Sequence, residues 1–321
     1  MKNLKNIKIF ALTAFISLGL FSCSSDDETG TPSLDTIAEI ASDNANLSIL
    51  VQALVKADLV GVLDSPGSYT VFAPTNTAFT AFLNANGYAN LDAIPPTTLK
   101  EVLLNHVVSG TLQSSQINTG YIKTLGKGSA SSTNTLSMYV AASSSGIRLN
   151  NQSNVVLNSA NILASNGIVH VVDAVIGLPT VVTFATADPN FSDLVTALTS
   201  PGQPDFVSIL SADGPFTVFA PTNAAFTSLT AELAAIPLVP TAAQLTAVLQ
   251  YHVVSGNVLS STLTNNQVVP TLQGDEFTIG LTGGGATITD ANLRLSNIIA
   301  VDVQAANGVI HVLDRVLLPT L

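Results

Sequence analysis

Four histidines are the side chains in this 321-residue chain whose type and spacing most suggest a reactive centre. They are His106, His170, His252 and His311. Asp173 and Asp314 follow the second and the fourth histidine by three positions. Imidazole beside carboxylate can bind zinc or transfer protons. One hypothesis is therefore a pair of metal or acid–base sites.

The spacing of these residues argues against that chemistry. In a β-strand, residues i and i+3 point to opposite faces, so His170 and Asp173 cannot ligate one ion without a bulge. His106 and His252 fall on the apolar stripes of predicted helices. A histidine there commonly packs in the core, with a ring nitrogen bonded to a backbone carbonyl. We therefore expect four structural histidines, no metal and no cofactor.

Other catalytic signatures are absent from the sequence. It contains no G-x-S-x-G elbow for a serine nucleophile and no phosphate-binding or dinucleotide fingerprint before a helix. The glycines at 283–285 lack a lysine and a strand-to-helix context, which favours a turn. The acidic residues are scattered, so no glycosidase pair can be argued. We expect a protein without enzymatic activity.

Cys23 is the only cysteine, and it follows a stretch typical of a secretion signal. Lys2, Lys5 and Lys8 precede an apolar segment over residues 9–20. That segment is shorter than the ~20 residues of a spanning helix but suits a signal peptide. Residues 20–23, Leu-Phe-Ser-Cys, resemble a bacterial lipobox. We predict a signal peptide over 1–22 and lipidation of Cys23; the alternative is an incidental cysteine near an ordinary cleavage site.

Residues 23–33 are polar and acidic, with Gly and Pro, which predicts a flexible tether. Acids just after a lipidated cysteine resemble the export signal that directs lipoproteins of some Gram-negative bacteria to the outer face of the outer membrane. We therefore expect an outer-membrane lipoprotein that faces the cell exterior. The alternative is a plain solvated linker.

The composition limits the partners. Apolar residues make up 47% of the chain and charged residues 10%, with a formal net charge of −11. A core of ordinary size can be built, and the surface must depend on Ser, Thr, Asn and Gly. Nucleic acid is excluded as an expected partner, because binding a phosphate backbone needs clustered Lys and Arg.

The sequence segments that are predicted to form the elements around the histidines occur twice in the chain. TVFAPTNTAF at 70–79 recurs as TVFAPTNAAF at 217–226, which predicts a strand, a proline stop and a capped helix in each copy. Thr98–Glu101 and Thr241–Gln244 read as capping boxes of a second helix. Each of those helices ends near a histidine followed by Val-Val-Ser-Gly.

A last block repeats as NGIVHVVD at 166–173 and NGVIHVLD at 307–314. Asn-Gly between apolar runs predicts a hairpin turn in which both residues have positive φ, with incoming strands at 160–164 and 298–303. Residues 124–150 and 262–297 read as β-hairpins. We place one α+β domain at residues 34–180 and a second at 181–321.

TVFAPTNxAF, the mid-domain histidine and NGxxHVxD together resemble the fasciclin domain family, over roughly residues 34–320. The resemblance implies two tandem domains, each a β-sheet wedge with packed helices. It also implies an extracellular protein associated with adhesion, in a family that is not generally enzymatic. Many members carry Tyr-His at the mid-domain histidine, a motif tied to adhesion in some of them. Tyr251-His252 keeps that motif, whereas the first copy has Asn105-His106.

Three functional hypotheses follow. The first is a non-enzymatic adhesion or binding module, anchored by an N-terminal lipid, whose partner is a protein or polysaccharide at the cell surface or matrix. The alternative is a glycan-capture accessory lipoprotein of a carbohydrate-uptake system, although the chain has no Trp and only five Tyr for stacking on sugars. The third is a hydrolase built on the histidines.

Overall fold

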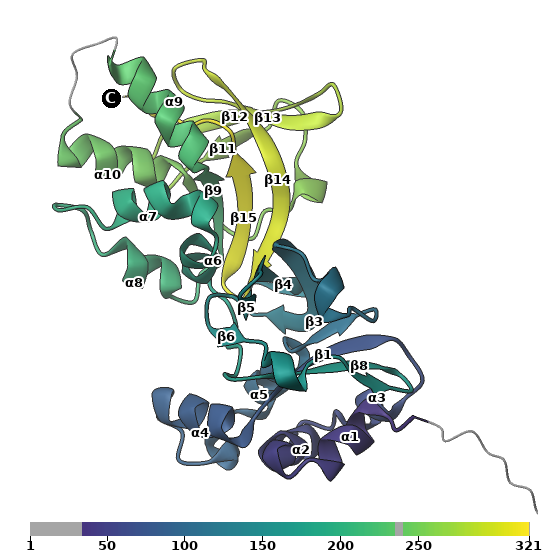
Figure 1. Ribbon diagram of the computed structural model, residues 1–321. Coiled ribbons are helices and arrows are strands. Elements are labelled where there is room, and N and C mark those ends of the chain that lie inside the picture. The colour runs from purple at the N-terminus through teal and green to yellow at the C-terminus, as the bar shows by residue number, and fades with distance from the viewer. Residues whose placement is uncertain (1–33, 235–239, 321) are drawn as a thin grey trace, which may run out of the picture. The chain divides into compact units, whose positions relative to one another are not determined.

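The computed structural model describes residues 34–234 and 240–320. The predicted signal peptide, Cys23 and the acidic tether lie outside the described residues. Each sequence repeat builds one β-sheet with helices packed against it (Figure 1). This arrangement confirms the predicted α+β class.

The first repeat contains five α-helices and eight strands among its described residues. The helices are α1 (Ile37–Asp43), α2 (Ser48–Lys56), α3 (Val60–Asp64), α4 (Asn76–Ala85) and α5 (Pro96–Leu104). The strands are β1 (Tyr69–Pro74), β2 (Val107–Ser109), β3 (Gly120–Gly128), β4 (Ser131–Ser143), β5 (Gly146–Leu149), β6 (Ser153–Asn154), β7 (Ile162–Ala164) and β8 (Gly167–Val172). Short 3-10 helices connect them at η1 (Ala45–Leu47), η2 (Leu91–Ala93), η3 (Ser114–Gln116) and η4 (Leu157–Ser159).

The second repeat follows the same order. Its helices are α6 (Val181–Ala187), α7 (Ser192–Leu198), α8 (Phe206–Ser211), α9 (Asn223–Ala234) and α10 (Ala242–Tyr251). Its strands are β9 (Phe216–Pro221), β10 (Val253–Ser255), β11 (Val268–Pro270), β12 (Glu276–Thr282), β13 (Gly285–Thr289), β14 (Leu295–Ala305) and β15 (Gly308–Leu313), with η5 (Pro189–Phe191) and η6 (Ser260–Thr262) between elements. Helices α6–α10 lie on one side of β9, β15 and β14 (Figure 1).

The two sheets share one cyclic strand order. The first runs β6-β5-β4-β3-β2-β1-β8-β7 and the second runs β10-β9-β15-β14-β13-β12-β11. At the centre of each, the strand of the TVFAP block pairs in parallel with the strand of the histidine-containing block. The first sheet is continuous through β2 and β3, whereas the second is continuous through β14 and β13. Each repeat is therefore a half-barrel. The two half-barrels differ in their edge strands, which are β6 and β7 in the first repeat and β10 and β11 in the second.

The repeated Pro-Thr-Asn has a specific structural use. The Thr75 hydroxyl accepts a hydrogen bond from the Ala78 N–H at 3.2 Å and caps α4. The next residue, Asn76, accepts from the Ile49 N–H at 2.9 Å and donates to the Ala45 carbonyl at 2.9 Å. Its equivalent in the second repeat makes the same contacts with α7 and η5. The motif thus ties α4 to α2, and α9 to α7.

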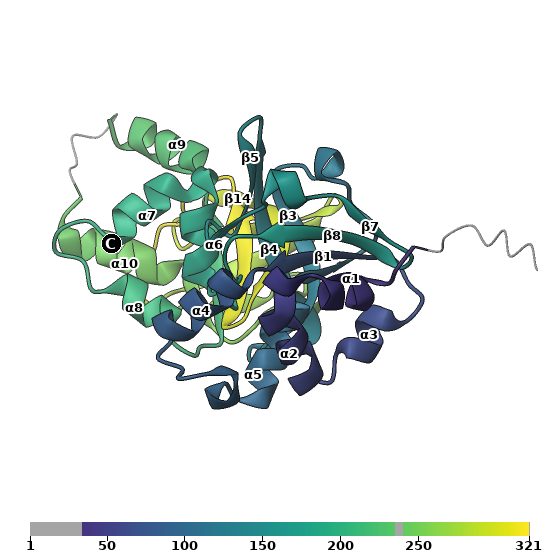
Figure 2. The same cartoon turned by 60° about the horizontal axis from the view of Figure 1, so that its bottom comes forward.

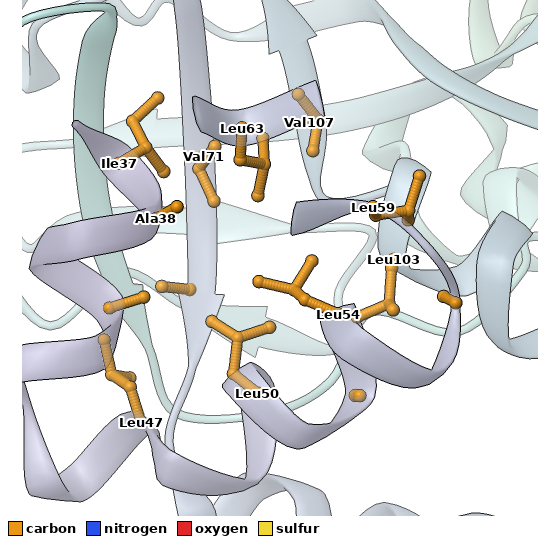
Figure 3. Packing of buried hydrophobic residues seen from close by; sticks show 14 of the residues in the cluster. Ile37, Ala38, Leu47, Leu50, Leu54, Leu59, Leu63, Val71, Leu103 and Val107 are labelled. Carbon is orange, nitrogen blue, oxygen red and sulfur yellow. The ribbon is translucent and has the colours of Figure 1, made fainter. Parts of the chain in front are cut away.

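The helical layer of the first repeat packs on one face of its sheet (Figures 1 and 2). In Figure 3, Leu54 of α2 lies between the strand residue Val71 and Leu103 of α5, and Leu50 of the same helix lies below them. A second cluster, which includes Phe72, Met138 and Ile176, fills the inside of the half-barrel. The second repeat has its own helical and half-barrel clusters.

Two tyrosines of the first repeat complete the helical core of the second. Tyr121 and Tyr139 pack in the cluster that contains Phe184. The rings of Tyr121 and Phe184 are arranged edge to face, with 5.5 Å between their centroids. The Tyr121 hydroxyl donates to the Asp188 carboxylate at 3.1 Å. Each repeat has its own core, and the two cores touch at this aromatic contact.

One capping prediction was right and the other was wrong. The Thr241–Gln244 capping box begins α10 as expected. The Thr98–Glu101 box does not form, because α5 begins earlier, at Pro96. Proline is favoured in the first helical position, since its fixed φ suits the helix and its missing N–H is not needed there. The Glu101 carboxylate instead accepts from the backbone N–H of Lys127 at 2.5 Å.

The Asn-Gly turn was also predicted wrongly. The hairpin between β7 and β8 exists, but Ala164 pairs with Gly167, so the loop residues are Ser165 and Asn166, and neither has positive φ. The second repeat shows the same shift. Gly167 is required for a different reason: a Cβ placed on it would lie 2.1 Å from the Tyr69 carbonyl oxygen. The glycine allows β1 and β8 to approach each other.

The Asn166 side chain holds the helical layer on the sheet. Its Nδ2 donates to the carbonyl oxygens of Leu63 at 2.6 Å and Ser65 at 3.0 Å, and its Oδ1 accepts from the Ile37 N–H at 3.0 Å. Asn307 makes the three equivalent bonds in the second repeat. We refer to these two residues as the asparagine clamps.

A small apolar cavity of about 40 Å³ lies in the helical core of the second repeat, and Val181 lines it. The equivalent residue in the first repeat is the buried Ile37. We expect Val181→Ile to raise the free energy of unfolding by about 0.8 kcal/mol, because one more CH₂ becomes buried. Urea denaturation measures the change. The reverse substitution, Ile37→Val, is the matched control and should lower the free energy of unfolding by about 1 kcal/mol. If both substitutions lowered it equally, the space beside Val181 could not hold the added methylene.

Candidate functional site

His106 is buried and bonded at both ring nitrogens. Its Nε2 accepts from the Ile176 N–H at 2.9 Å, so the proton lies on Nδ1, which donates to the Val102 carbonyl at 2.7 Å. His252 makes the same pair of bonds in the second repeat, at 3.0 and 2.7 Å. Each imidazole thus connects the end of a helix to the last segment of its repeat.

Burial lowers the pKa of both histidines to about 4, and the hydrogen bond to the helix carbonyl offsets only part of this effect. A charged imidazole would lose its water shell. Its protonated Nε2 could also no longer accept the hydrogen bond from the backbone N–H of Ile176 or Leu317. Both side chains are therefore neutral at pH 7. That state favours a packing role over acid–base chemistry.

His170 and His311 are also buried, each opposite a phenylalanine of the adjacent parallel strand. The His170 ring stacks on Phe72 with 5.7 Å between centroids, and His311 stacks on Phe219 at 5.3 Å. The Nε2 of His170 lies 2.8 Å from the Leu112 carbonyl oxygen. Burial lowers the pKa of both imidazoles. These residues, too, are held by packing and backbone contacts.

The carboxylates that follow these histidines in the sequence form hydrogen bonds with asparagines. Asp173 accepts from the backbone N–H and the side-chain amide of Asn154, at 2.7 and 2.9 Å. Asp314 binds Asn297 in the same way, at 2.8 and 2.6 Å. Within residues 34–234 and 240–320, no three His, Cys, Asp or Glu side chains gather where they could hold a metal ion. The hydrogen bonds of both aspartates are thus made to asparagines, and the hypothesis of a paired His–Asp site gains no support from them.

Tyr251 and His252, the candidate adhesion motif, are both inside the second repeat. The Tyr251 hydroxyl donates to the Glu276 carbonyl at 2.8 Å and accepts from the Ala291 N–H at 3.0 Å. Burial raises the pKa of this phenol to about 12. Neither side chain is exposed to a partner in this conformation. The motif stays a prediction, and any effect on adhesion would act through the backbone that these side chains support.

A surface groove in the first repeat is a candidate site that the sequence analysis missed. It has a volume of about 550 Å³ and lies between α4, α5 and the segment 174–178. Its lining includes Phe82, Tyr88 and Gln152. A signal was available in the sequence, because small alanines on these elements align with charged residues in the second repeat.

Among the described residues, no helix has both the length and the apolar character needed to cross a membrane.

A comparison with protein-family models finds the same domain in both repeats. The model of the fasciclin domain matches residues 45–179 and 189–319. The uncharacterized protein sll1735 of Synechocystis is 37% identical over 141 residues, which cover 44% of this chain and 98% of that protein. Human periostin is 28% identical over 260 residues, which cover 80% of this chain but only 29% of periostin.

One solved structure has a similar fold. It is a FAS1 domain pair from the insect cell adhesion molecule fasciclin I, with a TM-score of 0.55 and 19% sequence identity. The alignment covers 86% of this chain and 98% of that one. At this identity the likeness concerns the fold, and it extends across both repeats.

Proposed function

The chain belongs to the fasciclin domain family, and from this membership we propose that it is a non-enzymatic adhesion or binding module anchored at the cell surface by a lipid on Cys23. Fasciclin domains are associated with cell adhesion or binding, and their homologues are secreted or cell-surface proteins. The observation that carries the proposal is the tandem pair of domains, matched at 45–179 and 189–319.

The state of the histidines supports a role without catalysis. All four rings are buried, and each has a ring nitrogen within hydrogen-bonding distance of a backbone carbonyl oxygen. A general base must reach a substrate proton and needs a pKa near the working pH. Burial moves the pKa of His106 and His252 to about 4 and encloses both rings. A hydrolase built on these residues would lack both properties.

The anchor and the domain boundaries are part of the same proposal. Lipidation of Cys23 after removal of residues 1–22 would hold the protein at the outer membrane, since each buried CH₂ of an acyl chain contributes ~0.8 kcal/mol. Residues 23–33 would then serve as the tether. Domains at 34–180 and 181–321 would be presented to the cell exterior.

We expect protease added to intact cells to degrade the wild-type protein. Cys23→Ser should move most of the protein from the membrane fraction to the soluble fraction, because the acyl acceptor is lost. Immunoblotting of fractions, with metabolic labelling by a radioactive fatty acid, measures both effects. Ser22→Ala keeps both the thiol and a small residue before it, and serves as a control that still anchors. Protection from protease would contradict surface display, and an unlabelled wild type would contradict the anchor.

The glycan-capture alternative makes a different demand on the molecule. It requires a surface site that binds saccharide, in addition to the anchor. Because Tyr251 is buried with its hydroxyl bonded on both sides, that site would have to use other aromatic side chains.

A further inference from the structure

The groove in the first repeat has an apolar floor and a polar, uncharged rim. Small side chains of α4, Ala78, Ala81 and Ala85, form one wall. The half-buried rings of Phe82 and Tyr88 also line it. Asn86, Thr98 and the exposed Gln152 supply amide and hydroxyl groups. None of the lining residues is Asp, Glu, Lys, Arg or His.

The second repeat carries an ion-pair network at the equivalent place. Ala85 and Glu232 stand at the same distance from Asn76 and Asn223, the first residues of their helices. Ala174 and Arg315 both follow the aspartate of the last repeated block. Glu232 binds Arg315 at 3.3 Å and Arg294 at 2.7 Å. The Arg294 guanidinium also donates to the Val316 carbonyl at 3.0 Å.

Ala85 and Ala174 are the residues whose small side chains leave the groove open. Where the second repeat has the Glu232 carboxylate paired with the Arg315 guanidinium, the first repeat has the methyl groups of Ala85 and Ala174. The same backbone framework therefore carries a charged bridge in one copy and a neutral hollow of about 550 Å³ in the other.

A second hollow of about 660 Å³ adjoins the groove, and Thr98 and Leu178 line both. Hydroxyl side chains are frequent along it: Thr97, Ser129, Ser131, Ser132, Thr180 and Ser211. Its ionisable lining residues are Glu101, Lys127 and Asp213. The two hollows together offer a long, hydroxyl-lined surface that begins at two aromatic rings.

We propose that this groove binds a neutral oligosaccharide chain, with one sugar unit over Phe82 and Tyr88 and further units toward Thr98. The inference rests on the proposed function and names the partner class. A sugar ring has an apolar C–H face that packs on an aromatic side chain and hydroxyl groups that bond amides and hydroxyls. A charged ligand would lose water in the groove without meeting an opposite charge. A purely apolar ligand would leave the polar rim unpaired.

The test uses the full-length chain and measures its binding to maltohexaose, cellohexaose and laminarihexaose by isothermal titration calorimetry. We expect at least one of these neutral hexasaccharides to bind. The double variant Ala85→Glu/Ala174→Arg, which places the equivalent of the Glu232–Arg315 ion pair in the groove, should weaken that binding at least tenfold. The matched control, Glu232→Ala in the second repeat, should leave it unchanged.

Folding of the double variant is checked by its melting temperature, and Gln152→Ala gives a second variant at an exposed position. We expect Gln152→Ala to weaken binding about fivefold, as the loss of one hydrogen bond would. No binding of any hexasaccharide by the wild type, or unchanged binding by both variants, would overturn the inference. A protein that is surface-displayed and adhesive but binds no hexasaccharide would refute this inference alone.

Discussion

Acidification from pH 7 to pH 4 is expected to lower the free energy of unfolding by about 6 kcal/mol through His106 and His252 together. Both have a folded-state pKa of about 4, against 6.5 for an exposed histidine. As the pH falls below 6.5, the histidines bind protons in the unfolded chain but not in the folded chain. The free energy of unfolding therefore decreases as the pH falls. The stabilisation is complete above pH 6.5 and is lost as the pH approaches 4.

Urea denaturation at pH 7.0, 5.5 and 4.0 measures this effect, and single His→Gln variants isolate it from the carboxylates. His106→Gln and His252→Gln should each cost stability at pH 7, because Gln cannot keep both ring contacts. Each should also lower the acid-induced loss by about 3 kcal/mol, since one titrating group is gone. Equal pH dependence in the wild type and both variants would show that these imidazoles accept protons in the folded protein.

Much of the fold could be predicted from the sequence because its signals are local. The proline after TVFA, the threonine cap and the apolar stripes act within a few residues, and the structure uses them as expected in both repeats. The capping box at Thr98 failed because a competing local signal, Pro96, starts the same helix earlier.

The candidate site depends on contacts that no single stretch of sequence encodes. The groove is formed by α4, α5 and a segment far along the chain, and only the pairing of β1 with β8 brings these together. Alanines at positions 85 and 174 look unremarkable until they are compared with Glu232 and Arg315. The histidines could be assigned to packing, but which carbonyl or N–H each binds required the fold.

The Asn-Gly blocks show how a strong local pattern can be right about the element and wrong about the residue. Asn-Gly predicts a hairpin because both residues tolerate positive φ. The hairpin is present, but Asn166 has an ordinary φ and its side chain makes three bonds to the helical layer. The two explanations of the asparagine differ in what they predict for glycine at this position.

Asn166→Gly is expected to lower the free energy of unfolding by about 3 kcal/mol, because the clamp loses three hydrogen bonds in a site that is only 3% exposed. The Ile37 N–H and the Leu63 carbonyl would lose these partners in the core. A turn role predicts the opposite, since glycine is well suited to two-residue hairpin loops. Urea denaturation at pH 7 distinguishes the two.

Asn266→Gly is the matched control, because Asn266 is exposed and has a φ of 61°. Glycine adopts that conformation readily, so we expect a change below about 1 kcal/mol. Asn307→Gly should reproduce the loss in the second repeat, where the clamp binds Leu210, Ala212 and Val181. If Asn166→Gly and Asn266→Gly were equally mild, the asparagine would be a turn residue after all, and the helical layers would be held by apolar packing alone.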